Sequence, residues 1–345
     1  MFLKTTTFIF IVIAILASRS HASLQVTFTP EVGMMEGYTE YEMDYYFKFL
    51  NYITGEPVPT VWRINSLLEF PLDTKIGGFS ATLHPEIDQT RWSLYAKFLT
   101  SLTEPQEKML DSDWEGITTI FPYAQFSYTE SDANSNMHLY EVGFQYRIVD
   151  KENYDISMIF EAQYQQIFQE VTGYSGWYRP FDTSIIAYSD TTVAISGAED
   201  TIVITYKLQK EHVALGLQSN LFISDKLTTQ IHAAFTPILF NDTDDHTLRF
   251  KRSTSNGFGI GYKGGFNIRY ELPFSKLSFV QLNTTFSSFT AEGSQAQIWY
   301  EHERGIDPET QRSIILVREG TAIASIPHEV RSKQYTINLL FGITF

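Results

Sequence analysis

Cysteine is absent from this 345-residue chain, and positive charge is scarce. Without cysteine no disulfide can form, so packing or closed hydrogen bonding must hold an exported chain of this length together. Lys and Arg total 25 against 40 Asp and Glu, which gives a formal net charge of −15. This surplus of acid repels a phosphate backbone and argues against nucleic acid as a partner.

Long apolar runs are also missing, except at the N-terminus. Lys4 precedes an apolar run at residues 8–17, and Ser20 and Ala22 follow at the small-residue spacing of a signal peptidase site. The run is shorter than the roughly 18 apolar residues of a membrane-spanning helix. We therefore expect a signal peptide at residues 1–22 and a mature domain at residues 23–345. Loss of Lys4 and Arg19 with the leader would change the net charge from −15 to −17.

Aromatic residues and alternating patterns are abundant. The chain contains 20 Tyr and 27 Phe, and its C-terminus, QYTINLLFGITF, alternates apolar and polar residues and ends in Phe345. The same period of two recurs in HLYEVGFQYRI, HVALGLQSNLF and IGYKGGFNIRYEL. This period is typical of β-strands that have one apolar and one polar face.

A soluble β-sandwich and a membrane barrel share this alternation, so other features must separate them. The alternating segments are long, aromatic residues gather at their ends, and short turns such as DKEN and SDK alternate with long polar loops. Bacterial transmembrane barrels have short periplasmic turns and long outer loops of this kind. The sequence therefore predicts an all-β fold, a ten-stranded antiparallel transmembrane β-barrel, with the soluble β-sandwich as the alternative.

Two acidic clusters stand out from this pattern. KMLDSDWEG contains Asp111 and Asp113, and NDTDDH contains Asp242, Asp244 and His246. Counting strands from a periplasmic N-terminus places both clusters in loops at the external rim, where they can meet across the barrel mouth. Because alternate residues of an extended segment share a face, Asp244 and His246 point together and Asp245 points away.

These residue types suit hydrolysis by an activated water molecule. A neutral histidine, with an unperturbed pKa of about 6.5, can take the proton of water. A neighbouring aspartate fixes the histidine tautomer and stabilises the imidazolium that forms. Asp111 and Asp113 would share one proton, because two close carboxylates rarely both ionise. Solvated turns and a calcium site are the alternatives, although NDTDDH lacks the glycine and the closing glutamate of an EF-hand loop.

Several motifs occur together along the chain: TFTP near the mature start, Gly33 and Gly37, Glu42 to Tyr45, DSDW, DTDDH and the terminal Phe345. In these motifs the chain resembles the omptin family, ten-stranded outer-membrane endopeptidases of Gram-negative bacteria whose catalytic loops lie at the extracellular rim. The resemblance implies an aspartate- and histidine-dependent endopeptidase in the outer membrane, with its active site facing the cell exterior. It also implies the catalytic residues, which are Asp111, Asp113, Asp244 and His246.

The resemblance also implies a specificity pocket. In omptins two acids form a negative pocket for a basic residue, and here they would be Asp242 and Glu42. Cleavage at basic, and in particular dibasic, sites would follow. The family glutamate falls four residues after the second glycine, where this chain has Tyr41. A shift of one residue reverses the face of a strand unless a bulge absorbs it, so Tyr41 and Glu42 are both candidates for the pocket-facing position.

Omptins are also known to bind lipopolysaccharide through outward basic residues. The strand compared here, NYDISMIF, has Asp155 where a positive charge is expected. The sequence therefore gives no support for a lipopolysaccharide requirement, and no metal or other cofactor is expected. The expected partners are peptides or proteins with basic residues and outer-membrane lipid, around a monomeric barrel. The alternative function is a catalytically silent barrel that acts as a surface adhesin or pore.

Overall fold

The computed structural model describes residues 24–50, 57–85, 91–103, 106–118, 120–182, 187–273, 277–306 and 313–345. Nearly all of them lie in antiparallel strands, which confirms the predicted all-β fold. The predicted signal peptide, residues 1–22, lies outside the described residues and stays a prediction. Among the residues that are described, no helix is long and apolar enough to cross a membrane.

The strands follow one another with one short 3-10 turn between β11 and β12. In chain order they are β1 (Leu24–Leu50), β2 (Pro57–Pro71), β3 (Thr74–Pro85), β4 (Trp92–Ser101), β5 (Gln106–Ile117), β6 (Phe121–Asp150), β7 (Tyr154–Tyr178), β8 (Phe181–Asp182), β9 (Ala187–Tyr188), β10 (Val193–Ser224), β11 (Leu227–His246), η1 (Thr247–Arg249), β12 (Lys251–Glu271), β13 (Ser278–Trp299), β14 (Glu303–Ile306), β15 (Ser313–Val317) and β16 (Ala322–Thr344).

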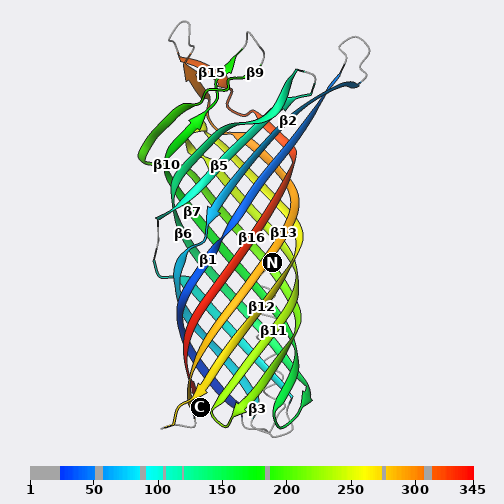
Figure 1. The fold of residues 1–345 in the computed structure, drawn as a ribbon, viewed down its shortest axis with the longest axis vertical. Coiled ribbons are helices and arrows are strands. Elements are labelled where there is room, and N and C mark those ends of the chain that lie inside the picture. Colours follow the sequence, from blue (N-terminus) through cyan, green and yellow to red (C-terminus); the bar gives the residue numbers. More distant parts are fainter. Residues whose placement is uncertain are drawn as a thin grey trace.

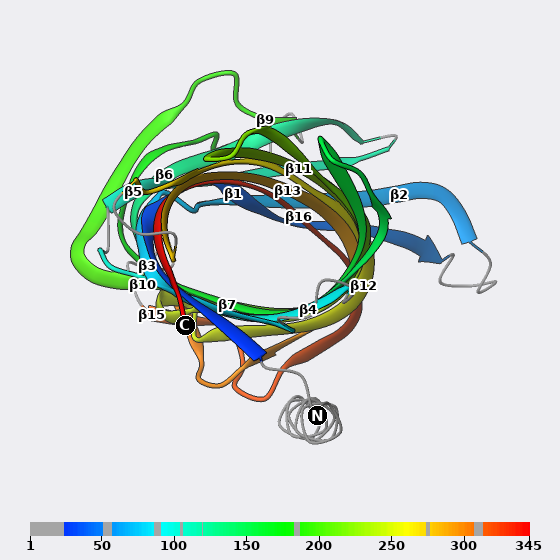
Figure 2. The same ribbon diagram turned by 90° about the horizontal axis from the view of Figure 1, so that it is seen from below.

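The large sheet closes on itself because its first and last long strands pair. β1 pairs with β16 from Thr27 opposite Thr344 up to Met43 opposite His328. Figure 1 shows the strands tilted around a tall barrel, and Figure 2 shows the closed ring from below. Closure lets the backbone groups at both edges of the sheet pair with each other, which a strand-built protein needs to cross a bilayer.

Two positions in the barrel wall are occupied by shorter strands that run end to end. β2 pairs with the upper part of β1 and β3 with its lower part, and β5 and β4 divide β6 in the same way. The sheet therefore contains twelve segments where the sequence predicts ten uninterrupted strands. At the β2–β3 break, Gly37 of β1 has a φ of 138° and donates a hydrogen bond to Asp73, a backbone conformation that glycine adopts without strain.

The outer surface of the lower wall is apolar. On β16 the predicted apolar face points outward, with Tyr335, Ile337, Leu339 and Phe341 between 40% and 57% exposed. The same surface continues over the neighbouring strands with Leu215, Leu217, Ile231, Phe235, Phe258, Ile260 and Tyr262. A band of outward apolar side chains around a closed barrel is the surface that lipid covers.

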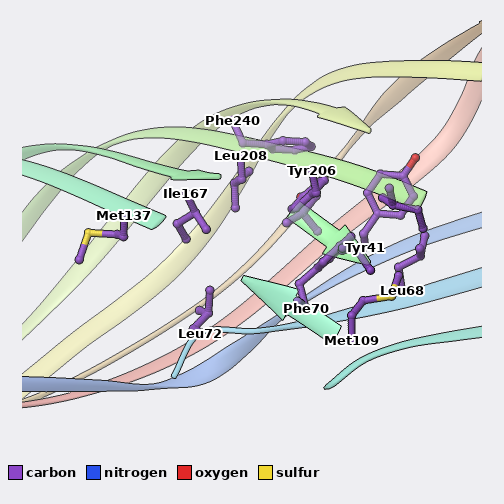
Figure 3. Packing of buried hydrophobic residues seen from close by; sticks show 14 of the residues in the cluster. Tyr41, Leu68, Phe70, Leu72, Met109, Met137, Ile167, Tyr206, Leu208 and Phe240 are labelled. Carbon is purple, nitrogen blue, oxygen red and sulfur yellow. The ribbon is translucent and has the colours of Figure 1, made fainter. Parts of the chain in front are cut away.

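Side chains cross the inside of the barrel at two levels. Lys263 of β12 donates hydrogen bonds to Glu141 of β6 at 2.7 Å and to Glu161 of β7 at 2.8 Å, so a charged network crosses the lumen. Above it lies a cluster of buried apolar side chains, part of which is shown in Figure 3. A lumen packed in this way disfavours a diffusion pore.

The inward-facing residues of β11 show how these layers follow one another. His232 lies in the polar lumen, Ile238 and Phe240 lie in the apolar cluster, and Asp242 and Asp244 come next towards the upper end. The candidate site therefore rests on an apolar floor inside the barrel mouth. This floor separates the acidic residues from the charged network below.

The two acidic clusters lie on strands and not in the predicted loops. Asp111 and Asp113 belong to β5, and Asp244 and His246 belong to β11. β5 is paired with β2 and β6, and β11 with β10 and β12, so both segments are held by hydrogen bonds on two sides. Their polar composition resembles a loop because a strand that extends above the lipid needs no apolar outer face.

Candidate active site

Asp244 and His246 share the inward face at the end of β11. Asp244 is fully buried, and its Oδ2 lies 2.8 Å from His246 Nε2. Among the described residues neither atom has another hydrogen-bond partner, so each is the nearest polar neighbour of the other. Asp245 points away, as the period of two predicts, and accepts hydrogen bonds from Arg252 at 2.7 Å and Tyr300 at 2.9 Å.

Asp111 and Asp113 occupy alternate positions of β5 and so share a face of that strand. Ser127 of β6 donates a hydrogen bond of 2.7 Å to Asp113 Oδ2, which orients that carboxylate. Oδ1 of Asp111 is buried and has no hydrogen-bond partner within the described ranges. Buried polar atoms without a partner are rare in folded proteins, and a catalytic role is one of the reasons they persist.

The two pairs act on each other electrostatically. Burial is the main cause that raises the pKa of Asp111 well above its usual range, and the charges of Asp113 and Asp244 raise it further. The positive charges of Lys251 and Arg249 oppose this shift. A raised pKa favours a proton on Asp111, so the arrangement suits a carboxyl pair that holds one proton between its members.

Burial also lowers the pKa of His246, against the opposing effect of the Asp244 carboxylate. The lowered pKa keeps the imidazole neutral at neutral pH, which is the state that can accept a proton. Because Nε2 faces Asp244, Nδ1 is the ring nitrogen left to act as the base.

Lys251 is a member of the cluster that sequence reasoning missed. It pairs with His246 across the turn that joins β11 to β12, and it is only 5% exposed. Burial lowers the pKa of its ammonium, while the carboxylates of Asp244, Asp113 and Asp111 oppose that shift. A buried cation here can stabilise negative charge that develops on a substrate. The sequence feature that could have identified Lys251 is the short turn after His246, which brings the chain back so that Lys251 lies opposite His246.

Asp242 lies on the same inward face of β11, one step deeper in the barrel. Its Oδ2 is 2.9 Å from His328 Nε2 and accepts a hydrogen bond of 3.2 Å from the Tyr206 hydroxyl. Its Oδ1 accepts a hydrogen bond from Ser255. The structure therefore brings Asp242 next to the Asp244–His246 pair, but with neighbours that the sequence analysis did not identify.

The structure corrects the predicted position of Glu42, which faces away from this pocket. β1 pairs with β2 in unbroken register from Tyr38 to Lys48. The period of two then turns Tyr41 inward and Glu42 outward, where it binds Arg331 and Asn65. Tyr41 is fully buried, so of the two candidates Tyr41 is the one that faces the pocket.

His328 and Tyr206 were also missed. The alternation of the C-terminal strand could have identified His328, since counting back in steps of two from Asn338 reaches it on the inward face. Tyr206 left no comparable signal, because its contact with Asp242 depends on how β10 pairs with β11.

The cofactor expectations are only partly addressed by the structure. Asp155, the expected marker of lipopolysaccharide contact, is 2% exposed at the start of β7, where it accepts a hydrogen bond of 2.8 Å from Asn220 and faces Arg147 at 3.6 Å. It lies inside the end of the barrel opposite the acidic clusters, so it bears on no outer lipid contact, and the lipopolysaccharide prediction stays untested. In the part of the chain that the structure describes, no group of three or more His, Cys, Asp or Glu residues could hold a metal ion.

The comparison with protein families identifies the chain. The model of the omptin family matches residues 78–305. The chain belongs to the omptin family. Membership of this family makes it a protease of the bacterial outer membrane. The matched residues include Asp111, Asp113, Asp244 and His246, whereas Tyr41 and His328 lie outside them.

Solved structures support the fold. The omptin chain is similar to the crystal structure of the outer membrane protease OmpT from Escherichia coli, with a TM-score of 0.66, 13% identity, and coverage of 93% of this chain and 97% of that chain. OprG from Pseudomonas aeruginosa gives a TM-score of 0.30 at 6% identity, covering 94% and 98%, and a FadL homologue from the same organism gives 0.25 at 8%, covering 93% and 90%. These two scores are too low to support an argument. A search of curated proteins found no match.

Proposed function

We propose that this omptin is an endopeptidase in which His246, oriented by Asp244, activates water opposite the Asp111–Asp113 pair. The observation that carries the proposal is the contact of 2.8 Å between Asp244 and His246 in the barrel mouth, together with Asp111, whose Oδ1 is buried and whose pKa the charge of Asp244 raises. A base with a lowered pKa and an acid with a raised pKa, in one site, form the usual pattern of general acid–base catalysis.

The chemistry balances with these residues alone. His246 Nδ1 takes a proton from water as the oxygen attacks the peptide carbonyl carbon, and Asp244 stabilises the imidazolium that forms. The protonated Asp111–Asp113 pair donates a hydrogen bond to the oxygen of the tetrahedral intermediate, and Lys251 adds a positive charge beside it. The imidazolium then gives its proton to the leaving amine as the carbon–nitrogen bond breaks. The products are a carboxylic acid and an amine, and no covalent enzyme intermediate forms.

The proposed substrates are proteins or peptides with basic residues, cleaved at dibasic sites by a monomer in the outer membrane. Asp242, directly below Asp244, is the acid proposed to attract the basic side chain before the cleaved bond, in competition with its internal partners His328 and Tyr206. The acidic surplus of the chain supports this choice, because it attracts cationic peptides and repels acidic ones. Charge-assisted hydrogen bonds from a guanidinium to a carboxylate give selectivity that a neutral side chain cannot match.

The test is hydrolysis of a peptide library by the purified barrel in lipid. We expect the wild type to cleave peptides that contain Arg-Arg or Lys-Arg, and His246→Ala to lower that activity by roughly 10² to 10⁴ while the barrel stays folded. Asp245→Asn is the matched control, since Asp245 is an acidic neighbour on the other face. Failure of the folded wild type to cleave any peptide would contradict the proposal and favour the catalytically silent barrel.

A further inference from the structure

The surroundings of Asp242 are those of a saturated buried acid. The side chains of His328 and Asp242 are 0% and 1% exposed, and their nearest atoms are 2.9 Å apart. Tyr206 and Ser255 add hydrogen bonds to the two carboxylate oxygens. A carboxylate offers about four acceptor positions, so three protein partners leave little capacity for a substrate group.

The contact between His328 and Asp242 needs a proton on one of its two groups. Its Nδ1 lies 3.2 Å from the backbone carbonyl oxygen of Glu42, and its Nε2 faces the Asp242 carboxylate. A carbonyl oxygen can only accept, so the hydrogen bond at Nδ1 uses one ring proton. The contact at Nε2 then needs a second proton, carried by the ring or by the carboxyl. In both cases the His328–Asp242 pair is neutral as a unit.

Aromatic side chains fix His328 in this position. The ring centroids of His328 and Tyr41 are 4.5 Å apart, and those of His328 and Phe240 are 5.8 Å apart. Tyr41 also meets Tyr206 edge-on at 5.8 Å. Figure 3 shows Tyr41, Tyr206 and Phe240 gathered in the apolar cluster inside the barrel. Together with His328 they fill the space around Asp242 that a long basic side chain would have to enter.

His328 comes from a distant part of the wall. β13 and β12 separate β16 from β11 in the ring, so the side chain of His328 reaches Asp242 through the interior and not from a neighbouring strand. The contact therefore crosses part of the barrel interior and occupies the side of Asp242 that faces it. An arginine can reach Asp242 only if it displaces this internal partner.

We propose that His328 is a specificity-determining residue that, with Tyr41, occupies the Asp242 pocket in place of a basic substrate side chain. The inference rests on the proposed function, because specificity is measured on a cleaved bond. An arginine before the cleaved bond must displace His328 and Tyr41, whereas an alanine needs no such displacement. The wild type therefore discriminates for arginine less than an open acidic pocket does.

The experiment compares kcat/KM for two peptides that differ only by Arg or Ala before the cleaved bond. We expect His328→Ala to raise the ratio of kcat/KM for the Arg peptide to that for the Ala peptide by about tenfold or more. This is the effect expected when the Asp242 carboxylate becomes available for one charge-assisted hydrogen bond. His212→Ala is the matched control, because His212 is another lumen histidine and its ring nitrogens make no hydrogen bond to any described residue. It should leave the ratio unchanged. An unchanged ratio in folded His328→Ala would overturn the inference.

Two further variants keep the test decisive. The double variant His328→Ala with Asp242→Asn should lose the gained preference, because Asp242 is its source. If His328→Ala fails to fold, His328→Gln keeps a neutral hydrogen-bonding group between Asp242 and the Glu42 carbonyl, and we expect a smaller rise in the ratio. A loss of arginine preference in folded His328→Gln would contradict the proposal.

A binding measurement separates this inference from the proposed function. In the His246→Ala background, N-acetyl-arginine amide and N-acetyl-alanine amide are titrated calorimetrically into the barrel in detergent. We expect the arginine compound to bind about tenfold more tightly when His328→Ala is added, the gain expected of a freed charge-assisted partner, with the alanine compound unaffected. Equal arginine binding in both backgrounds would contradict the role of His328. Absence of hydrolysis by the wild type, with this gain intact, would contradict only the proposed catalysis.

Discussion

Asp242 and Asp244 lie two residues apart on one face of β11, yet their environments are opposite. Both oxygens of Asp244 are buried and lack a straight hydrogen bond from any described residue, as does Nε2 of His246. Both oxygens of Asp242 have partners: His328 Nε2 lies 2.9 Å from Oδ2, and Ser255 donates a hydrogen bond to Oδ1. The difference shows that burial alone does not make an acid reactive, because its hydrogen-bonding capacity must also be left free.

The neighbours explain the difference. Asp242 lies at the level of Phe240 and Tyr206, in the apolar cluster, where an unpaired carboxylate is unfavourable. Asp244 lies one step higher, where Asp111 and Lys251 are near enough to interact with its charge. One strand thus carries a satisfied acid at the floor of the cleft and an unsatisfied acid above it.

The largest effect should come from the catalytic base. His246→Ala should lower kcat by roughly 10² to 10⁴, the range attributed to a positioned acid or base. Asp244→Asn should act in the same direction, because it removes the charge that stabilises the imidazolium. The measurement is peptide hydrolysis by barrels shown to be folded by their heat-modifiable migration on a gel. Activity within a factor of two of the wild type would remove His246 from the mechanism.

Lys251→Met should change the pH dependence of kcat/KM. His246 must be neutral, so activity rises as pH increases through its lowered pKa, which places the acid limb below the ordinary histidine value of about 6.5. The Asp111–Asp113 pair must keep its proton, so activity falls as pH rises through the raised pKa of Asp111. Lys251 lowers both pKa values, and its removal should therefore move both limbs to higher pH. Limbs that move to lower pH would contradict the electrostatic account.

Ser127→Ala should have a moderate effect. It removes the hydrogen bond of 2.7 Å that orients Asp113, a contact with a charged acceptor of a kind worth about 1.5 to 3 kcal/mol. Since Asp113 stays solvated in part, we expect kcat to fall by about tenfold, with KM little changed. A rise in KM at constant kcat would indicate that Ser127 serves substrate binding and not the orientation of the pair.

Asp245→Asn should have the smallest effect. Asp245 binds Arg252, whose side chain is 53% exposed, and such partly exposed ion pairs contribute about 0 to 1 kcal/mol. Because the free energy of such an ion pair is small, peptide hydrolysis should stay within about threefold of the wild type. A loss as large as that of Asp244→Asn would show that β11 does not keep its period of two at this end.

The barrel could be predicted because period-two alternation is local. In the C-terminal strand, the alternation correctly predicts one shared face for the apolar residues from Tyr335 to Phe341, because each is two positions from the next. The same rule placed Asp244 and His246 together and Asp245 apart. What it did not reveal is that β2 and β3 share one position in the wall, because a break within a strand depends on the neighbouring β1.

The pocket could not be predicted, because it depends on contacts between strands that are far apart in the chain. Family resemblance suggested Glu42, but the unbroken register of β1 turns Tyr41 inward. The partner of Asp242 is His328, 86 residues further along the chain, and nothing local connects the two. Lys251 is close to His246 in the sequence, but its place beside His246 can be inferred only when the turn between them is known to be tight.

The central claim is that Asp242 is paired internally while the His246 base is left free, and the histidine ring nitrogens report on both. In barrels labelled with ¹⁵N-histidine in lipid, signals of His246 and His328 can be assigned by their loss in the two alanine variants. At pH 7 we predict a neutral His246 with one unprotonated nitrogen free of hydrogen bonds, and a His328 whose two nitrogens are both hydrogen-bonded. A free nitrogen on His328, or an imidazolium at His246, would contradict the account.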